Sequence, residues 1–360
     1  MRVRNRHRRP DRGHPPRRSN PQAGQAEKGI RSTPPLVAAG MASPDQARAV
    51  VATAFGGPEV LSLTDVTVGP PGPEHVLVEV RAAAVNPIDY KVYSGARGAD
   101  PSKLPMRIGY EASGVVKALA DGALGPAGPL KVGDEVIAYP VQGAYASEIV
   151  APAASALPKP ATLSFEQASG LMLTGVTAFH ALTVVRAGKG DTVVVHGAAG
   201  GVGLMVVQLA VNLGARVIGT AGVGGHGFLH QFGAEPVVYG EGLLERIRAL
   251  APDGVDAAVD TVGTDEAIDV SLALVPDRER IVSIAAFQRG PALGIKVIGN
   301  GPGADPGTEI RRAARLELLR LVEEGSLRVV VSAIYPLYEA GAAHQAAKRG
   351  HMHGKIVLVP

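Results

Sequence analysis

The chain has 360 residues, of which 46% are hydrophobic and 19% are charged, so it has room for two or three domains and the composition of a globular protein. It contains no cysteine, which excludes disulfides, thiolate catalysis and zinc sites built on cysteine. Residues 1–40 carry ten basic and two acidic side chains, whereas the rest of the chain carries 26 basic and 31 acidic ones. The mildly acidic remainder predicts no nucleic-acid partner.

Residues 1–40 are rich in Arg, Pro and Ser and are predicted to be a disordered basic leader. The leader could bind an anionic partner or be a transit peptide, although its prolines disfavour the amphipathic helix of a transit peptide. We favour an upstream extension of the reading frame, with Met41 as the natural start. The charge-free stretch 192–215 contains five glycines and fits strand, turn and helix better than a membrane span. We therefore expect a cytoplasmic protein with no membrane partner.

From residue 49 to about 160, short β-like segments are separated by Gly and Pro, which predicts a small β-rich barrel or sandwich. These segments are AVVATAF, HVLVEVRAAAV, YEASGVVKAL, DEVIAYP and GAYASEIV.

From about residue 165 the pattern changes to short apolar strands that alternate with helices, which predicts a doubly wound parallel sheet and an α/β fold. A helical stretch over residues 165–185 opens this region, and an amphipathic helix begins near Glu309 with Thr308 as its expected N-cap. The last predicted strand is KIVLVP. The segments between the two helices are TVVVH, GLMVVQLAVNLG, ARVIGT, FLHQFG, LLERIRAL, GVDAAVD, EAIDVSLAL, RIVSIAA and GIKVIG.

The most informative stretch is an apolar strand, residues 192–196, that runs directly into the glycine-rich loop 197–203 and then into a helix. Gly200 would let the backbone approach a pyrophosphate, and Gly203 would let the helix pack closely on the strand. The helix N-terminus would supply free amides and a positive dipole end to the phosphates. This arrangement predicts a dinucleotide site; the alternative is a tightly packed glycine turn that binds no ligand.

The choice between NAD and NADP is expected at the end of the second strand of this unit. No acidic residue occurs between Leu204 and Ala234, and no Lys or Arg occurs between Val217 and Glu245. Only His226 and His230 could carry positive charge there. Because the acid that favours NAD is missing, we predict NADPH, with NADH possible.

With these motifs in hand, the chain resembles the zinc-independent branch of the medium-chain dehydrogenase/reductase superfamily, and within it the quinone oxidoreductases of zeta-crystallin type and the enone oxidoreductases. The resemblance implies a GroES-like β-rich catalytic domain, residues 41–165 and 306–360, with a Rossmann NAD(P)-binding domain, residues 166–305, inserted between its two parts and the active site in the cleft. The motifs are FGGPEVL at 55–61, VNPIDYK at 85–91, IGYEASGVV at 108–116, LKVGDEV at 130–136, GAYASE at 143–148, LTGVTAFHAL at 173–182, AAGGVG at 198–203 and HGKIVLVP at 353–360.

The resemblance also implies roles for individual residues. Asn86 would orient the nicotinamide or the substrate, Lys91 would polarise the substrate carbonyl or hold the cofactor ribose, and Tyr93 completes the candidate catalytic set. The candidate cofactor-binding residues are Thr177, Ala199, Gly200, Gly201, Val202, Gly203, Thr220, Gly222, His226, Val262, Ala285 and Lys355.

Two positions depart from the pattern of the relatives. Ala96 and Arg97 follow Ser94-Gly95 where many relatives have a tyrosine, so solvent could protonate the enolate in place of a tyrosine. Gly222 and Gly224 stand where many relatives have a Ser and an Arg for the NADP phosphate.

Zinc members of the superfamily use a Cys and the His of a GHE motif, whereas this chain has Gly109-Tyr110-Glu111 and no Cys. We therefore expect no metal, and two histidines in His351-x-His353 are too few ligands to change this. The implied activity is hydride transfer from NADPH to a small electrophile, either a quinone or the C=C of an α,β-unsaturated carbonyl, by a homodimer. The alternatives are an enoyl reductase that tailors a polyketide or other secondary metabolite, and a catalytically silent NADPH-binding relative.

Overall fold

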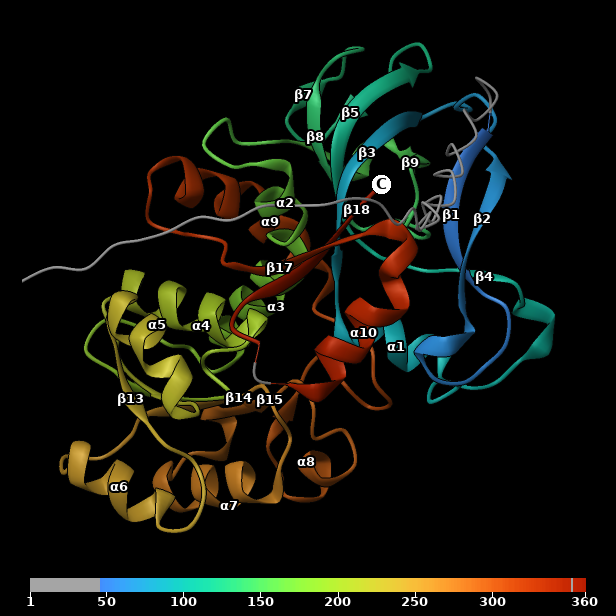
Figure 1. Ribbon diagram of the computed structural model, residues 1–360. Coiled ribbons are helices and arrows are strands. Elements are labelled where there is room, and N and C mark those ends of the chain that lie inside the picture. The colour runs from blue at the N-terminus through green and yellow to red at the C-terminus, as the bar shows by residue number, and fades with distance from the viewer. Residues whose placement is uncertain (1–45, 351) are drawn as a thin grey trace, which may run out of the picture. The chain divides into compact units, whose positions relative to one another are not determined.

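The computed structural model describes residues 46–350 and 352–360, so the predicted leader lies outside the described residues. The β-rich part contains a three-stranded sheet in the order β2-β1-β4 and a seven-stranded sheet in the order β10-β8-β5-β3-β18-β17, with β9 also paired to β3 (Figure 1). The strands are β1 (Gln46–Ala52), β2 (Leu61–Thr67), β3 (His75–Val85), β4 (Met106–Arg107), β5 (Ala112–Leu119), β8 (Glu135–Ala138), β9 (Glu148–Pro152), β10 (Ala156–Pro158), β17 (Val331–Pro336) and β18 (Lys355–Val359), with β6 (Leu124–Gly125) and β7 (Gly128–Pro129) as a separate pair.

Strand β3 is central to this sheet, and its sequence explains why. Val76, Val78 and Val80 alternate with more exposed residues and point into the β-rich core, which is the period-two pattern of a half-covered strand. From Ala82 to Val85 every residue is buried, because β18 pairs with this end of the strand. The end of β3 therefore lies inside the molecule, and Asn86 follows it directly.

The second sheet is parallel, with the order β13-β12-β11-β14-β15-β16. Alternate residues of one strand enter different cores: Val193 and Val195 pack with helices α3, α4, α5 and α9, whereas Val194 packs with α6 and α7. The sheet is thus covered on both faces, which confirms the predicted doubly wound α/β fold (Figure 1). The strands are β11 (Thr192–His196), β12 (Arg216–Thr220), β13 (Ala234–Val237), β14 (Ala257–Asp260), β15 (Ile281–Ser283) and β16 (Lys296–Val297).

The helices show two local differences from the predictions. The helix expected over residues 165–185 is divided into α2 and α3 at Gly170, where a side chain would meet the Lys355 side chain. The N-cap of α9 is Gly307 and not Thr308, because φ is +56° at this position and a Cβ would lie 2.1 Å from the His180 ring. The helices are α1 (Pro87–Tyr93), α2 (Phe165–Ser169), α3 (Met172–Val184), α4 (Gly201–Asn212), α5 (His226–Gln231), α6 (Leu243–Leu250), α7 (Asp265–Leu274), α8 (Arg289–Ala292), α9 (Thr308–Glu323) and α10 (Ala340–Arg349).

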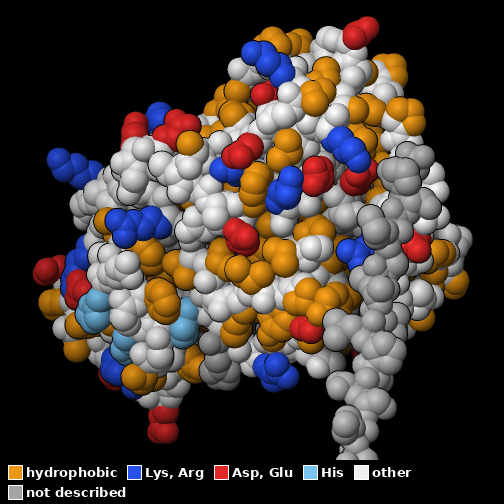
Figure 2. Space-filling view, turned by 45° about the horizontal axis from the view of Figure 1, so that its top comes forward, with side chains coloured by type: hydrophobic (Ala, Val, Ile, Leu, Met, Phe, Trp, Pro, Cys, Tyr) orange, Lys and Arg blue, Asp and Glu red, His pale blue; other side chains and the backbone are white. Residues whose placement is uncertain are grey.

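Helix α9 belongs to the same core as the parallel sheet, since Ala314 and Leu318 pack with the residues of α3 and α4. The predicted domain boundary at residue 306 assigns this helix to the β-rich domain, and that boundary stays a prediction. On the face shown in Figure 2, acidic and basic side chains are interspersed. None of the helices in the described part of the chain is long and apolar enough to cross a membrane.

Candidate functional site

The glycine loop between β11 and α4 has the geometry expected of a dinucleotide loop. Gly197 has a φ of +72°, and a Cβ there would lie 2.5 Å from Thr261 Oγ1, so this position requires glycine. A Cβ on Gly203 would lie 2.2 Å from the Gly197 carbonyl oxygen, which explains the close packing of helix on strand. At Gly200 the only atom within 4 Å of such a Cβ is that same carbonyl oxygen, at 3.4 Å, so the outer side of the loop is open.

The N-terminus of α4 is suited to an anion. The helix has 12 residues, and its N-cap, Gly200, makes no side-chain hydrogen bond. Within the described ranges, the amides of Val202 and Gly203 have no hydrogen-bond acceptor, whereas the Gly201 amide faces the Gly354 carbonyl oxygen in the parallel bridge between Gly200 and Gly354. Free amides and the positive end of the helix dipole favour a phosphate group, so these residues fit the pyrophosphate of a dinucleotide.

Other predicted cofactor contacts follow the carboxyl ends of successive parallel strands, the edge at which such sheets bind ligands. Thr220 ends β12, and its Oγ1 accepts a hydrogen bond from the Gly197 amide at 3.2 Å. Val262 follows β14 and is 48% exposed, an unusual position for an apolar side chain. The Asp260 carboxylate fixes this turn by accepting from the amides of Val262 and Gly263. Ala285 follows β15, so the structure brings these residues to one edge.

The segment after β12 contains the predicted residues Gly222 and His226. Gly222 has a φ of −66°, so any residue could adopt its backbone, and a Cβ there would meet only the ring of Tyr239, with its hydroxyl at 3.8 Å. His226 is less suited to its predicted role, because its Nε2 atom is buried and has no hydrogen-bond partner in the described part of the chain.

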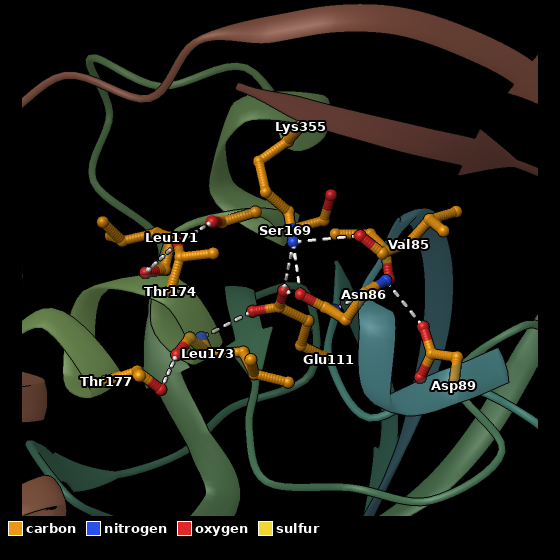
Figure 3. A network of polar contacts seen from close by, with 12 residues as sticks. Val85, Asn86, Asp89, Glu111, Ser169, Leu171, Leu173, Thr174, Thr177 and Lys355 are labelled. Carbon is orange, nitrogen blue, oxygen red and sulfur yellow. Dashed lines mark hydrogen bonds and ion pairs between the residues drawn. The ribbon is translucent and has the colours of Figure 1, made fainter. Parts of the chain in front are cut away.

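A buried polar network joins the β-rich part to the start of α3 (Figure 3). The Lys355 ammonium donates to the carbonyl oxygen of Val85 at 3.2 Å, to Asn86 Oδ1 at 2.5 Å and to Glu111 Oε1 at 3.2 Å. Glu111 Oε2 accepts from the Leu173 amide at 2.8 Å, at the start of α3. The side chains of Lys355 and Glu111 are 4% and 0% exposed, so this is a buried ion pair. Four chain segments meet at these two side chains.

This network changes the roles of two predicted site residues. The Asn86 amide group donates both of its protons inside the protein, to Ala84 O at 3.2 Å and to Glu111 Oε1 at 3.0 Å. The three protons of the Lys355 ammonium are also used internally. Neither group has a proton left for a cofactor or substrate, so the structure makes both residues positioning groups. Only the stem of Lys355 reaches the loop, with its Cδ 3.3 Å from a Cβ built on Gly201.

Thr177 lies on α3, one turn after Leu173 (Figure 3). It is nearly buried, and its hydroxyl donates to the Leu173 carbonyl oxygen at 2.8 Å. The hydroxyl oxygen therefore acts toward a ligand only as an acceptor. Because the Leu173 amide is held by Glu111, the same network fixes the position of Thr177.

Tyr93 lies in the core of the β-rich part and not at an accessible site. Its side chain is fully buried, and its hydroxyl pairs with His344 Nδ1 at 3.0 Å. The other ring nitrogen of His344 pairs with the Tyr145 hydroxyl at 3.1 Å, which in turn donates to Asp89 Oδ2 at 2.6 Å. Burial raises the pKa of Tyr93 far above its usual value. This placement gives Tyr93 a structural role and does not support its predicted catalytic role.

Lys91 is half-buried and faces a residue of the parallel-sheet part. Its Nζ lies 5.9 Å from the centre of the Phe287 ring, a cation–π distance. Burial, with a smaller effect of Arg97, lowers the pKa of Lys91. Arg97 itself donates to the carbonyl oxygen of Asn300 at 2.8 Å. The VNPIDYK motif and the residues that follow it therefore contact the 287–300 region through Lys91 and Arg97, which linear spacing could not show.

Tyr110, which occupies the expected zinc-ligand position, is half-exposed. Burial raises the pKa of its hydroxyl, with a further contribution from Asp89 and an opposing one from Arg97. Across residues 46–350 and 352–360, no group of three or more His, Cys, Asp or Glu side chains could hold a metal ion. The absence of a metal from the protein remains a prediction.

Comparison with known proteins gives matches over most of the chain. The alcohol dehydrogenase GroES-like domain family matches residues 72–161, and the zinc-binding dehydrogenase family matches residues 232–358. The chain is 33% identical over 331 residues to a quinone oxidoreductase of Mus musculus, covering 87% of this chain and 97% of that protein. It is 33% identical over 328 residues to quinone oxidoreductase 1 of Escherichia coli, and the match covers 85% of this chain and 97% of that protein.

Solved structures show the same similarity. The structure of Escherichia coli quinone oxidoreductase complexed with NADPH gives a TM-score of 0.75 at 30% identity, covering 87% of this chain and all of that one. The structure of a mycobacterial protein complexed with NADPH gives a TM-score of 0.76 at 32% identity, and the match covers 87% of this chain and 100% of that one.

Proposed function

Since the chain belongs to the medium-chain dehydrogenase/reductase family and is an oxidoreductase of the quinone oxidoreductase type, we propose that it reduces a quinone or the C=C of an α,β-unsaturated carbonyl with NADPH. The observation that carries the proposal is the glycine loop, whose open side and free α4 amides lie at the carboxyl edge of a parallel sheet. When bound, NADPH supplies the hydride.

The protein's part in binding follows from the loop and the sheet edge. The free amides of Val202 and Gly203, at the start of α4, would hold the pyrophosphate, with Gly200 and Gly201 letting it approach the backbone. Val262 and Ala285, after β14 and β15, would provide the apolar surface next to the adenosine and nicotinamide halves. Thr177 would accept a hydrogen bond from the nicotinamide side, held in place by the Glu111–Leu173 contact.

The substrate needs a positive or proton-donating group where its oxygen becomes negative. Lys91 is suited to this, because a lowered pKa makes its ammonium a stronger hydrogen-bond and proton donor. The Phe287 ring beside it offers an apolar face to a flat acceptor. Tyr110 and Arg97 are further polar groups near this position, and solvent or Lys91 would supply the proton that completes the reduction.

The proposal covers both a quinone and an enone acceptor, with the enoyl reductase and the silent binding protein as alternatives. A homodimer and a metal-free site are part of it. The test is a titration of nicotinamide fluorescence with NADPH and NADH, followed by turnover with a panel of quinones, enones and enoyl thioesters. NADPH binding with turnover of a quinone or enone supports the proposal. Turnover of enoyl thioesters alone would favour the tailoring reductase, and binding without turnover would favour the silent relative.

A further inference from the structure

The segment after β12 has no fixed cation of its own. In dinucleotide-binding units of this kind, the group that distinguishes NADP from NAD lies just after the second strand. Here that position is occupied by Gly222 and Gly224, no Lys or Arg occurs between Val217 and Glu245, and His226 Nε2 is buried. A positive group for a 2′-phosphate must therefore come from another part of the chain.

The C-terminal segment reaches this position. Gly354 forms a parallel bridge with Gly200, and its amide donates to the Ala199 carbonyl oxygen at 3.3 Å. Gly354 has a φ of +92°, and a Cβ there would lie 2.4 Å from the Val330 carbonyl oxygen, so the backbone at this point is closely constrained. His353 is consequently held beside the glycine loop, although 150 residues separate the two in the sequence.

The imidazole of His353 points at the loop after β12. A Cβ built on Gly224 would lie 3.3 Å from His353 Nε2, and one built on Gly225 would lie 3.3 Å from Cε1. The ring also packs on Phe228, with the ring centres 5.4 Å apart. The ring is half-buried, and in the described part of the chain neither of its nitrogens has a hydrogen-bond partner. Figure 2 shows histidine side chains gathered on the surface over α5, the helix that carries Phe228.

We propose that His353 is the residue that recognises the 2′-phosphate of NADPH, an inference that rests on the proposed function. The imidazole donates a hydrogen bond from Nε2 and, when protonated, adds a positive charge. Gly222 and Gly224 leave the space in which a phosphate group can approach that nitrogen. The C-terminal segment thus supplies what the β12 loop lacks.

The test compares His353→Gln with the unaltered chain. Dissociation constants are measured by nicotinamide fluorescence for NADPH and NADH, and by calorimetry for 2′,5′-ADP and 5′-AMP, which lack the nicotinamide. We expect H353Q to raise the dissociation constants of NADPH and 2′,5′-ADP about tenfold or more, and to change those of NADH and 5′-AMP less than about twofold. His230→Gln is the matched control, because His230 is an exposed histidine on the neighbouring helix, and it should change none of the four.

A pH series provides a second readout. NADPH should bind more tightly to the unaltered chain as the pH falls from 8 to about 6, and this trend should disappear in H353Q. The other titratable groups on the segments packed around the ring are His226 and His230 on α5, Tyr239 after β13, Arg328 before β17 and Lys355 on β18. They remain in H353Q, so a trend that persists in the variant belongs to them and would contradict the role of His353.

Two kinds of failure are distinguishable. An unchanged NADPH-to-NADH ratio in H353Q, or equal weakening of both dinucleotides, would overturn this inference and leave the proposed function standing. No binding of either dinucleotide to the unaltered, folded chain would overturn the proposed function itself, and this inference with it. If H353Q does not fold, His353→Asn with the same ligands decides the question, and a shift of the His353 imidazole NMR signals by 2′,5′-ADP but not by 5′-AMP decides it without a variant.

Discussion

Replacing Lys355 with Met tests whether the buried network holds the two halves of the site together. Methionine has a similar length but removes the charge, so Glu111 loses its cation while keeping the neutral donors Asn86 Nδ2 and the Leu173 amide. The two side chains are 4% and 0% exposed, so water cannot replace the ammonium without rearrangement. Breaking a buried ion pair on one side costs about 3–5 kcal/mol, and we expect K355M to lower the free energy of unfolding by that amount.

A double-mutant cycle separates the cost of breaking the ion pair from the cost of lost packing. The double variant K355M/E111Q removes both charges, and because replacing a whole buried pair is often nearly neutral, it should recover most of the loss.

Urea unfolding followed by far-ultraviolet circular dichroism measures these differences, since the chain has no tryptophan. The control is Lys296→Met, which removes a lysine from the exposed pair with Glu279 and should cost no more than about 1 kcal/mol. If K355M costs as little as K296M, or if the double variant is as unstable as the two single variants combined, the network does not stabilise the fold as argued.

Four further predictions concern charge, substrate, cofactor and metal. Burial raises the pKa of Asp89 from 3.8 to about 7. Between these two pH values the folded chain keeps a proton that the unfolded chain releases, so the stability contributed by Asp89 declines as the pH rises from about 4 to 7. Asp89→Asn should remove this decline. The free energy of unfolding of D89N, relative to that of the unaltered chain, should therefore rise by up to about 4 kcal/mol between about pH 4 and pH 7. A difference between the two free energies that does not change with pH would contradict the assignment. Lys91→Met should lower kcat for quinone or enone reduction about 10²–10³-fold with the Kd of NADPH unchanged, whereas a change confined to the Kd would place Lys91 on the cofactor. Gly222→Arg should strengthen the binding of NADPH, but not of NADH, by about 1.5–3 kcal/mol, roughly 10–150-fold. Gly222 is a better position than Gly224, where a new side chain would displace His353. Equal effects on the two cofactors would show that the 2′-phosphate does not bind near residue 222. Elemental analysis should find far less than one zinc per chain, and chelators should leave turnover unchanged; stoichiometric zinc required for activity would show that the metal prediction is wrong.

The glycine loop was predictable because its chemistry is local. One strand, one loop and one helix follow each other in the sequence, and the required glycines, Gly197 and Gly203, are set by the turn and by the contact of helix with strand. The alternation of apolar strands and helices after residue 165 predicted the doubly wound sheet for the same reason. The N-cap of α9 was misassigned because the contact that requires glycine at position 307 comes from His180, on another helix.

The side-chain partners in the site were not predictable, because they come from distant segments. Tyr93 meets His344 across 251 residues, and Lys355 meets Glu111 across 244. The resemblance implied a nicotinamide or substrate contact for Asn86, but Asn86 is also the N-cap of α1, where its backbone amide donates to Asp89 Oδ2 at 2.7 Å. His353 entered the sequence analysis as a possible metal ligand and as the first residue of the HGKIVLVP motif, since nothing in its neighbourhood in the sequence indicates the loop after β12.

The most direct test of the central claim is hydride transfer from NADPH labelled with deuterium at C4 of the nicotinamide. The purified chain is incubated with the labelled cofactor and a small enone, and the product is examined by mass spectrometry and NMR. The account predicts one deuterium at the β-carbon of the product and a primary isotope effect on NADPH oxidation with a quinone. Binding of NADPH by the folded chain without oxidation by any quinone or enone in the panel, or a product without deuterium, would contradict it.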